Sequence, residues 1–166
     1  MRTATYNGNR NEDMRMGNSL STADEVLGYL HSIPITLTVK KTVYQQLQAE
    51  IYDEHLHSLK KKLSDIALLE EDWDGYEAER INPLTIKKFK KVLAACKTTD
   101  FAEWSLSPNT NGTLLLERDE AAISIASKEY SCYAEQGERY MEENHHEFTV
   151  TSLLDTVRRI NAFLVS

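Results

Sequence analysis

The residue types most able to do chemistry gather in one acidic stretch, EEDWDGYEAERINP, which runs from Glu70 to Pro83. Closely spaced carboxylates can bind a cation, exchange protons in acid/base catalysis, or recognise a basic partner. Local rules explain the end of the stretch, because Asn82 and Pro83 are typical of a helix start. Helix capping does not account for the segment before this helix start, which is a candidate recognition corner. It consists of Asp72, Trp73, Asp74, Gly75 and Tyr76.

An EF-hand calcium loop in this stretch is excluded by one position. An EF-hand loop has a glycine at its sixth position, which Gly75 could fill. Positions one, three and five would then be Glu70, Asp72 and Asp74. The twelfth position, where the loop requires a bidentate Glu, is Ile81. Two carboxylates alone can suit Mg²⁺, but nothing in the sequence supplies the rest of its shell, so we expect no metal and no cofactor.

The same acids have a catalytic and a structural interpretation. As an acid/base pair, Asp72 and Asp74 would need environments that separate their pKa values, and Trp73 offers an apolar wall. As a rigid corner, Trp73 and Tyr76 would anchor the chain to a sheet and Gly75 would adopt a positive φ. The aspartates would then accept hydrogen bonds from turn amides. The sequence favours the corner, which leaves its exposed acids for recognition.

Two histidine groups are the other candidates for metal binding. His55 and His57 stand two positions apart, a spacing that does not share a helix face, so they predict a solvated pair. The second group lies in the polar segment from Glu135 to Glu147, which predicts a loop. It lacks cysteine partners and a closed ligand spacing, so we expect no Zn²⁺ there. Its members are Glu142, Glu143, His145, His146 and Glu147.

The chain lacks the motifs of the common enzyme classes. It contains no P-loop, no Rossmann glycine pattern, no GxSxG elbow and no HExxH pair. A small ribonuclease-like enzyme needs no linear motif, so an enzyme acting on RNA or a nucleotide through Asp72 and Asp74 stays an alternative. The sequence favours a protein without catalytic residues.

Composition sets the broad class. At 166 residues, of which 41% are hydrophobic, the chain suits one globular domain. Its formal net charge of -7 disfavours binding to nucleic acid and to anionic membranes. Cys96 and Cys132 are too few for a disulfide framework, and no apolar run suits a signal peptide or a membrane span. We therefore expect a cytoplasmic protein.

Two segments make up a candidate nucleic-acid face. ITLTV, from Ile35 to Val39, alternates branched residues with threonine and predicts a strand. With the residues up to Ile51 it resembles the strand and helix of ribbon-helix-helix proteins, which implies a DNA-binding antitoxin. The second segment is a lysine cluster on the helix after Pro83. A sheet-edge strand and a solvated helix surface are the favoured interpretations. The candidates are Thr36, Thr38, Lys40, Lys87, Lys88 and Lys91, with Lys90 beside them.

A long helix is predicted from about Lys41, because apolar residues recur at steps of three and four along one stripe. The stripe comprises Val43, Leu47, Ile51, Leu56, Leu59, Leu63 and Ile66. About 30 helical residues would extend about 45 Å, so part of the stripe could face a partner chain, as in a homodimer. The alternative is a break between His55 and Ser58 into two helices.

The remainder predicts a helix, a sheet and a closing helix. Asn82 and Pro83 begin the first of these helices, and turns such as Asn111-Gly112 then separate short strands that must run antiparallel. We expect four strands, around Trp104 and Leu106 and at 113–117, 121–126 and 129–134. Apolar steps of four, three and four from Leu153 predict the closing helix.

These elements predict an α+β fold. The long helix and the helix from Pro83 would form a helical hairpin, joined at the corner and packed on a four-stranded antiparallel meander with the C-terminal helix. Residues 1–22 are expected to be a flexible leader. Residues 23–166 would form a single domain, with 23–40, including a short helix, as an N-terminal arm.

One long block also resembles a known group. LLEEDWDGYEAERINPLTIKKFKKVL, then WSLSPNTNGTLLLE and AAISI, is similar to uncharacterised bacterial proteins with a DWDGYGA signature. The similarity runs from about Leu63 to Tyr133. It implies a bacterial or phage origin and the helix-plus-meander layout, but the group has no established activity. Glu77 stands where a second glycine is common in the group.

The sequence therefore predicts a cytoplasmic, non-enzymatic protein-binding module of immunity, antitoxin or counter-defence type. The acidic charge, the missing catalytic motifs and the surplus length of the first helix favour this function. The expected partner is another protein, with a homodimer through the long helix. We expect no membrane association, and nucleic-acid binding is disfavoured.

Overall fold

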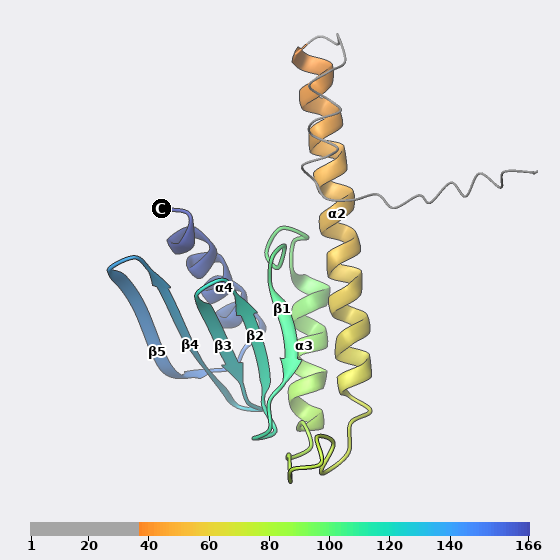
Figure 1. Ribbon diagram of the computed structural model, residues 1–166, viewed down its shortest axis with the longest axis vertical. Coiled ribbons are helices and arrows are strands. Elements are labelled where there is room, and N and C mark those ends of the chain that lie inside the picture. The colour runs from red at the N-terminus through yellow and green to blue at the C-terminus, as the bar shows by residue number, and fades with distance from the viewer. Residues whose placement is uncertain (1–36) are drawn as a thin grey trace, which may run out of the picture. The chain divides into compact units, whose positions relative to one another are not determined.

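The computed structural model describes residues 37–166, so the expected leader and most of the arm lie outside the described residues. Residues 43–166 form one compact unit. Figure 1 shows the elements in chain order. They are α2 (Leu37–Ile66), α3 (Pro83–Ala95), β1 (Ser105–Pro108), β2 (Leu114–Arg118), β3 (Ala121–Ile125), β4 (Glu129–Gln136), β5 (Arg139–Glu147) and α4 (Val150–Leu164). The predicted α+β class is confirmed.

The sheet is an antiparallel meander in the order β1-β2-β3-β4-β5. It has one strand more than predicted, because the polar segment expected to be a loop forms β5 and pairs with β4. That strand lies at the edge of the sheet and most of its residues are exposed. It therefore lacks the alternation of apolar residues by which a sequence reveals a strand. A bulge between Tyr130 and Cys132 interrupts its pairing.

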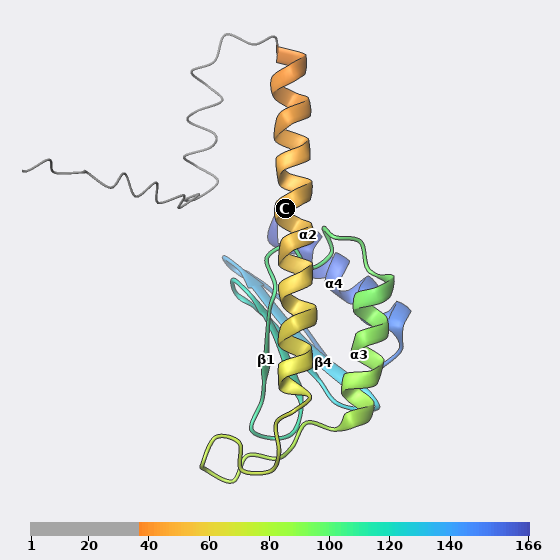
Figure 2. The same ribbon diagram turned by 90° about the vertical axis from the view of Figure 1, so that its right-hand side faces the viewer.

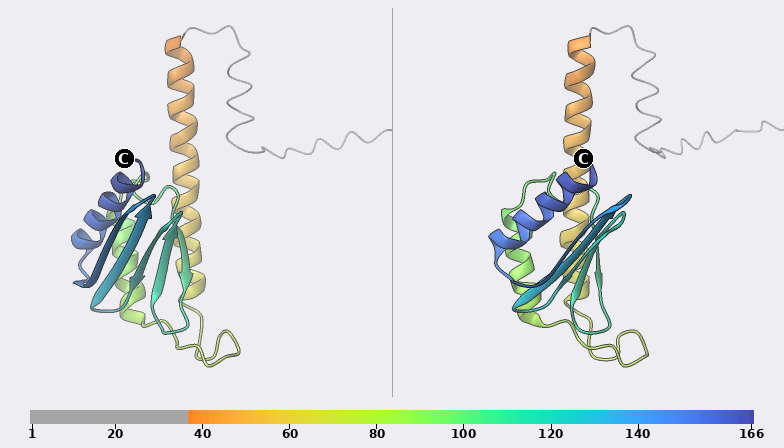
Figure 3. Two further views of the ribbon diagram at one scale, coloured as in Figure 1. Left: turned by 60° about the vertical axis from the view of Figure 1, so that its left-hand side comes forward. Right: turned by 90° about the vertical axis from the view of Figure 1, so that its left-hand side faces the viewer.

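One face of the sheet builds the core. Leu106, Leu116, Ile123 and Cys132 stand opposite one another across four strands, and all four are buried. Figure 3 shows α3 and α4 lying against this same face. They contribute a cluster of buried apolar side chains. It includes Ile86, Phe89, Val92, Leu93, Leu153, Leu154, Val157 and Ile160. A one-sided sheet explains why its strands alternate between buried and partly exposed residues.

The first described helix is unbroken from Leu37 to Ile66, which settles the two alternatives left by its length. The predicted strand from Ile35 to Val39 is wrong over Leu37–Val39, which are helical. Alternating branched residues favour a strand only when a neighbouring strand pairs with them. Within the described residues, β1 is the first strand and pairs with β2 alone.

The seven apolar residues predicted as one stripe of α2 divide into two groups. Leu56, Leu59, Leu63 and Ile66 are buried in the core, and Figure 2 shows this part of α2 beside α3, as the predicted hairpin requires. Val43 and Ile51 are 37% and 43% exposed, and Leu47 is half-buried. We call Val43, Leu47 and Ile51 the outer stripe. Among the described residues, no helix has the length and apolar character needed to cross a membrane.

Candidate recognition corner

The corner between α2 and α3 closes on itself through its own carboxylates. The Asp72 Oδ1 atom accepts a hydrogen bond from the Glu77 N–H at 2.8 Å. The Asp74 Oδ1 atom accepts from the N–H groups of Tyr76 at 2.8 Å and Ala78 at 3.2 Å. The Asp72 N–H in turn donates to the Ala78 carbonyl at 2.9 Å. Both aspartates therefore hold the backbone, as the structural interpretation expects.

Three residues of the loop have left-handed backbone conformations. Gly75 has a φ of 75°, as predicted, and Asp72 and Glu77 have φ values of 60° and 66°. Asp tolerates this region because its short side chain can bond locally, whereas Glu gains no such benefit. Glu77 thus stands at a position that favours glycine, the residue that the resemblance would lead one to expect there.

The two aromatic residues of the corner behave differently. The Trp73 Nε1–H donates to the Glu79 carbonyl at 3.2 Å, and the ring is partly buried. Tyr76 is 88% exposed, so the prediction that it anchors the corner to the sheet is wrong. The aspartate hydrogen bonds already close the loop, and this leaves the Tyr76 ring in solvent. Leu68, which precedes the corner, is also largely exposed.

The Asn111-Gly112 turn holds the segment that follows the corner, Glu79 and Arg80, against the sheet. The Glu79 N–H donates to the Thr110 carbonyl at 2.8 Å, and Glu79 forms an isolated parallel bridge with Asn111. Gly112 has a φ of 76°. A Cβ atom there would lie 3.1 Å from the Glu79 Oε2 atom and 3.2 Å from the Arg80 carbonyl oxygen. Only glycine fits this contact without displacement.

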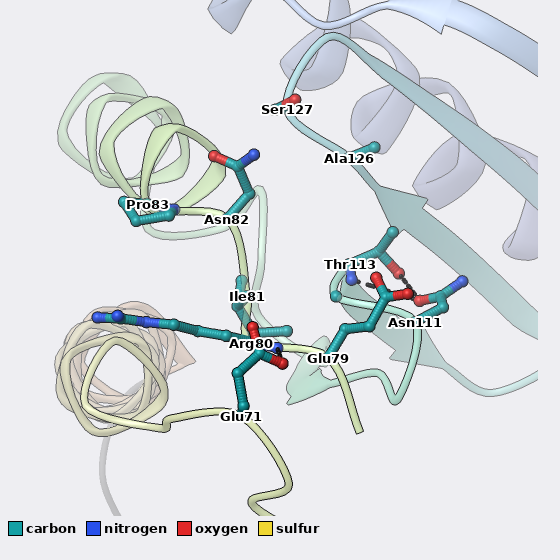
Figure 4. A pocket seen from close by; sticks show the side chains of 11 residues that line it. Glu71, Glu79, Arg80, Ile81, Asn82, Pro83, Asn111, Thr113, Ala126 and Ser127 are labelled. Atoms are coloured by element: carbon teal, nitrogen blue, oxygen red, sulfur yellow. Dashed lines mark hydrogen bonds between the residues drawn. The ribbon is translucent and has the colours of Figure 1, made fainter. Parts of the chain in front are cut away.

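A cleft of about 370 Å³ lies where the corner meets the turn and the start of α3. Figure 4 shows Glu79 pointing toward Asn111 and Thr113, while Arg80 extends in another direction. Two of the other polar side chains here, Glu71 and Asn82, accept hydrogen bonds from backbone N–H groups. The Glu71 Oε2 atom accepts from the Arg80 N–H at 3.1 Å, and the Asn82 side chain caps α3 through the Leu84 N–H at 2.9 Å.

The Thr113 hydroxyl in this cleft lies 2.7 Å from the Asn111 Oδ1 atom and 3.1 Å from the Ser124 hydroxyl. Among residues 37–166, no group of three or more His, Cys, Asp or Glu side chains could hold a metal ion. The exposed groups that remain at the corner are Tyr76 and acidic side chains, which suit recognition better than bond making.

The structure changes the interpretation of several candidate nucleic-acid residues. Thr36 lies outside the described residues, and Thr38 and Lys40 belong to α2, so the operator-binding strand has no counterpart at these two positions. Lys88 donates from its Nζ to the carbonyls of Ser127 at 2.8 Å and Phe148 at 3.1 Å. It therefore holds α3 to the sheet instead of joining the basic face. The lysines left exposed on α3 are Lys87, Lys90 and Lys91.

The histidines have partners of their own. The His55 Nε2 atom lies 2.9 Å from the Trp104 carbonyl oxygen, so only His57 of that pair is solvated as predicted. His145 contacts Glu129 at 3.1 Å. His146 contacts Glu143 at 3.1 Å and stacks on Tyr130. Each of these rings contacts a different partner, so the histidines do not converge on one place where a metal ion could bind.

A partly buried polar network around Asn161 was not predicted from the sequence. The Asn161 Oδ1 atom accepts from the Trp104 Nε1–H and from the Arg118 Nη1–H, each at 2.8 Å. The Asn161 Nδ2–H donates to the Asp100 carbonyl at 2.8 Å. Arg118 also pairs with Glu103. We call these residues the Asn161 network. The one sequence signal was Trp104, because a buried indole N–H needs a partner.

Asp100 extends the network through a paired arginine. The Arg158 Nε and Nη2 atoms donate to the two Asp100 carboxylate oxygens at 3.0 and 2.9 Å, and the Lys97 N–H donates to Oδ2 at 2.8 Å. Burial disfavours the Asp100 carboxylate, but the hydrogen bonds and charge of Arg158 and the Lys97 N–H outweigh it. The pKa of Asp100 therefore lies below its ordinary value.

A second cleft of about 370 Å³ borders this network. Arg118 and Asn161 line it, and the Arg118 charge is paired with Glu103 and Asp119, although the buried Arg118 Nε atom has no hydrogen-bond partner. It therefore offers no free charge to an anionic ligand. The network holds α4, β2 and the segment before β1 together, which is a structural role.

The chain matches no protein-family model, no curated protein and no solved structure. The resemblance to the DWDGYGA group stays a prediction. Two segments within the resemblance are in direct contact, because Glu79, which follows the corner, pairs with Asn111 and donates to the Thr110 carbonyl.

Proposed function

We propose that the chain is a protein-binding module that recognises its partner through the corner, with Tyr76 as the central contact residue. The observation that supports this function is the 88% exposure of the Tyr76 side chain on a loop that hydrogen bonds hold closed. Tyrosine is enriched among the residues that carry most of the binding energy of protein interfaces.

The closed loop also lowers the cost of binding. Asp72 and Asp74 fix the backbone on both sides of Tyr76, so less conformational entropy is lost when a partner docks. Glu70 and Glu77 are exposed nearby in the sequence and add negative charge. A partner surface that offers a pocket for the ring within a rim of Lys or Arg would fit this corner.

The enzymatic alternative rests on the same aspartates. Their engagement with backbone N–H groups disfavours it, because a general acid or base must reach a substrate. Any nucleotide- or RNA-directed activity can be compared between the wild type and a double variant with Asp72→Ala and Asp74→Ala. An activity found in both, or in neither, removes the corner from catalysis.

The test of the proposed function uses two exposed tyrosines. Tyr76 and Tyr140 are 88% and 72% exposed, and each can be replaced by a photo-crosslinking benzophenone amino acid in the full chain. In the cells from which the protein comes, we expect a defined protein adduct from position 76 that position 140 does not give. Equal adducts from both positions, or none from position 76, would overturn the proposal.

The more specific proposal, which names the kind of protein-binding module, rests on the sequence alone. A module of immunity, antitoxin or counter-defence type in a bacterial cytoplasm is supported by the acidic composition and by the resemblance to the DWDGYGA group. The genes adjacent to its own provide the test. A neighbouring toxin or phage defence module would support this type, and a conserved metabolic operon would contradict it.

A further inference from the structure

The helical hairpin carries a lysine-rich surface that the proposed function does not use. Helix α3 contains four lysines and no acidic residue. The part of α2 from Leu56 to Ile66 adds three lysines and a single aspartate. We call five of these residues the hairpin lysines, and all of them are exposed: Lys60, Lys61, Lys87, Lys90 and Lys91.

Two of the hairpin lysines lie toward the boundary between α2 and α3, which run beside each other in Figure 2. Burial raises the pKa of Cys96, the residue that ends α3, and the charge of Lys60 opposes this rise, so Lys60 lies on the α3 side of α2. Lys88 reaches the Phe148 carbonyl just before α4. At about 100° per residue, Lys90 points about 160° away from Lys88, and therefore toward the α2 side.

The other three hairpin lysines point into solvent. Lys61 lies about 180° from the mean direction of the buried residues in this part of α2, and Lys87 and Lys91 each lie about 160° from that of α3. The ion pairs among residues 37–166 all use arginine or histidine, so no described carboxylate pairs with a hairpin lysine. The five charges therefore form one basic surface, assembled from two helices that are separated in the sequence.

We propose that this surface binds double-stranded DNA through its phosphates, without reading the base sequence. Lysine is a flexible point charge that contacts single phosphates along a nucleic-acid backbone, and such contacts carry no sequence information. The net charge of -7 disfavours nucleic acid for the chain as a whole, but the surface that the phosphates would meet is locally basic.

The composition of the surface favours DNA over a protein or a membrane. Leu84 is the one exposed large apolar residue on α3, and the α2 segment from Leu56 to Ile66 has none. Protein interfaces are enriched in arginine and aromatic residues and depleted in lysine, and docking on a membrane would need apolar side chains to insert. Single-stranded nucleic acid would stack its bases on exposed aromatic rings, and neither segment exposes a Phe, Tyr or Trp.

The arrangement in two rows favours DNA over an RNA duplex. Packed helices lie about 8–10 Å apart, so the lysines of α2 and those of α3 form two rows with a similar separation. In B-form DNA the minor groove is about 6 Å wide, which brings the phosphates of both strands within reach of the two rows. The minor groove of an A-form RNA helix is wide, and its two strands lie farther apart across it.

The number of lysines sets the expected salt dependence. Each phosphate contact releases counterions, so with five contacts the binding constant should fall with salt concentration at a log–log slope of about -4. The net charge of -7 opposes the approach of DNA, and we therefore expect a Kd of about 10⁻⁵ M at low salt. The proposal does not depend on the function of the corner, because the two surfaces share no residue.

Fluorescence anisotropy tests the proposal. A labelled DNA duplex of about 20 base pairs is titrated with the full chain at about 20 to 200 mM NaCl, and two unrelated base sequences should bind equally. Lys91→Glu should weaken binding at least about tenfold at the lowest salt. Replacing both Lys87 and Lys91 by alanine should reduce the magnitude of the slope by about 2.

The matched control is Lys62→Glu, which makes the same change of charge on the opposite flank of α2. Lys62 points about 160° away from Lys60, on the side where His55 contacts the Trp104 carbonyl. Its substitution should weaken binding less than about twofold. Equal helix content by circular dichroism in the variants and the wild type shows that the fold is retained.

Three results would overturn the proposal. The first is no binding of the duplex at about 20 mM NaCl and about 200 µM chain, and the second is an equal loss in Lys91→Glu and Lys62→Glu. The third is tighter binding of an RNA duplex, of polyglutamate or of vesicles containing phosphatidylserine, which would assign the surface to that anion. Crosslinking from position 76 should be unchanged in Lys91→Glu, which separates this result from the test of the corner.

Discussion

The corner and the Asn161 network both fix loops with polar side chains, but they span different distances along the chain. The corner's side-chain hydrogen bonds join residues at most nine positions apart. Those that Asn161 makes to Trp104, Arg118 and Asp100 span 43 to 61 positions. The corner lies in solvent, whereas Trp104 is fully buried.

The difference predicts separate effects of substitutions in the two regions. When a solvated hydrogen bond breaks, water replaces the lost partner and the cost is small. When a buried one breaks, a donor or acceptor is left unsatisfied, which costs about 1–3 kcal/mol for each group. We therefore expect stability to depend on the Asn161 network, and surface recognition to depend on the corner.

Removing the centre of the network should have the largest effect. Asn161→Ala leaves the Trp104 N–H, one Arg118 N–H and the Asp100 carbonyl without their shared partner. We expect a loss of about 4 kcal/mol in the free energy of unfolding, measured by urea denaturation. The matched control is Asn144→Ala in β5, whose side chain contacts Glu142 at the surface and should cost less than about 0.5 kcal/mol. Similar losses in the two variants would contradict the comparison.

Asp100→Asn should lower stability by about 2–3 kcal/mol at pH 7, because it removes one charge of a partly buried ion pair. The pKa of Asp100 is depressed in the folded state, so its contribution is complete above the unfolded pKa of about 3.9. It is lost as the pH falls through the folded pKa. The difference in Tm between wild type and variant should therefore shrink below about pH 4.

Asp155→Asn is the control for this titration. The Asp155 carboxylate also contacts Arg158, at 3.5 Å, but it is exposed. Its substitution should change stability by less than about 0.5 kcal/mol. A difference for Asp100→Asn that stays constant from pH 7 to 2.5 would show that the carboxylate charge does not stabilise the network.

Two glycine variants measure how firmly the corner is attached to the sheet. Gly75 and Gly112 both have φ near 75°, but a Cβ atom at Gly75 has no neighbour within 4 Å. Gly75→Ala should cost about 1 kcal/mol from backbone strain alone. Gly112→Ala should cost about 2 kcal/mol in thermal denaturation, because the added methyl group also meets the Arg80 carbonyl. Equal costs would mean that the turn and the corner can separate freely.

Glu77→Gly should have the smallest effect and the opposite sign. Relief of the left-handed strain exceeds the greater unfolded-state entropy of glycine, so we expect stabilisation by about 0.5 kcal/mol. Glu142→Gly, at an ordinary strand position in β5, should instead destabilise by a similar amount. A lower Tm for Glu77→Gly would show that the Glu77 side chain contributes to the corner.

The predictions from sequence succeeded where the determining interactions are local. The cap at Asn82, the positive φ of Gly75 and the aspartate hydrogen bonds depend on neighbours within a few residues. The predictions failed for β5, whose strand forms through pairing with β4, and for Tyr76, whose exposure depends on how the closed loop lies. Neither the pairing of β5 nor the exposure of Tyr76 produces a periodic pattern of apolar residues in the sequence.

The sequence by itself determined the α+β class, the start of α3 and the residues of the corner, because periodicity, capping and turn chemistry act over a single element. The tertiary structure alone decided that the Asn111-Gly112 turn docks on Glu79 and Arg80, and that Asn161 unites Trp104, Arg118 and Asp100. It also decided that α2 has a core side and an outer stripe. These features arise when elements distant in sequence come together and exclude water, and only the folded chain specifies which polar groups then meet.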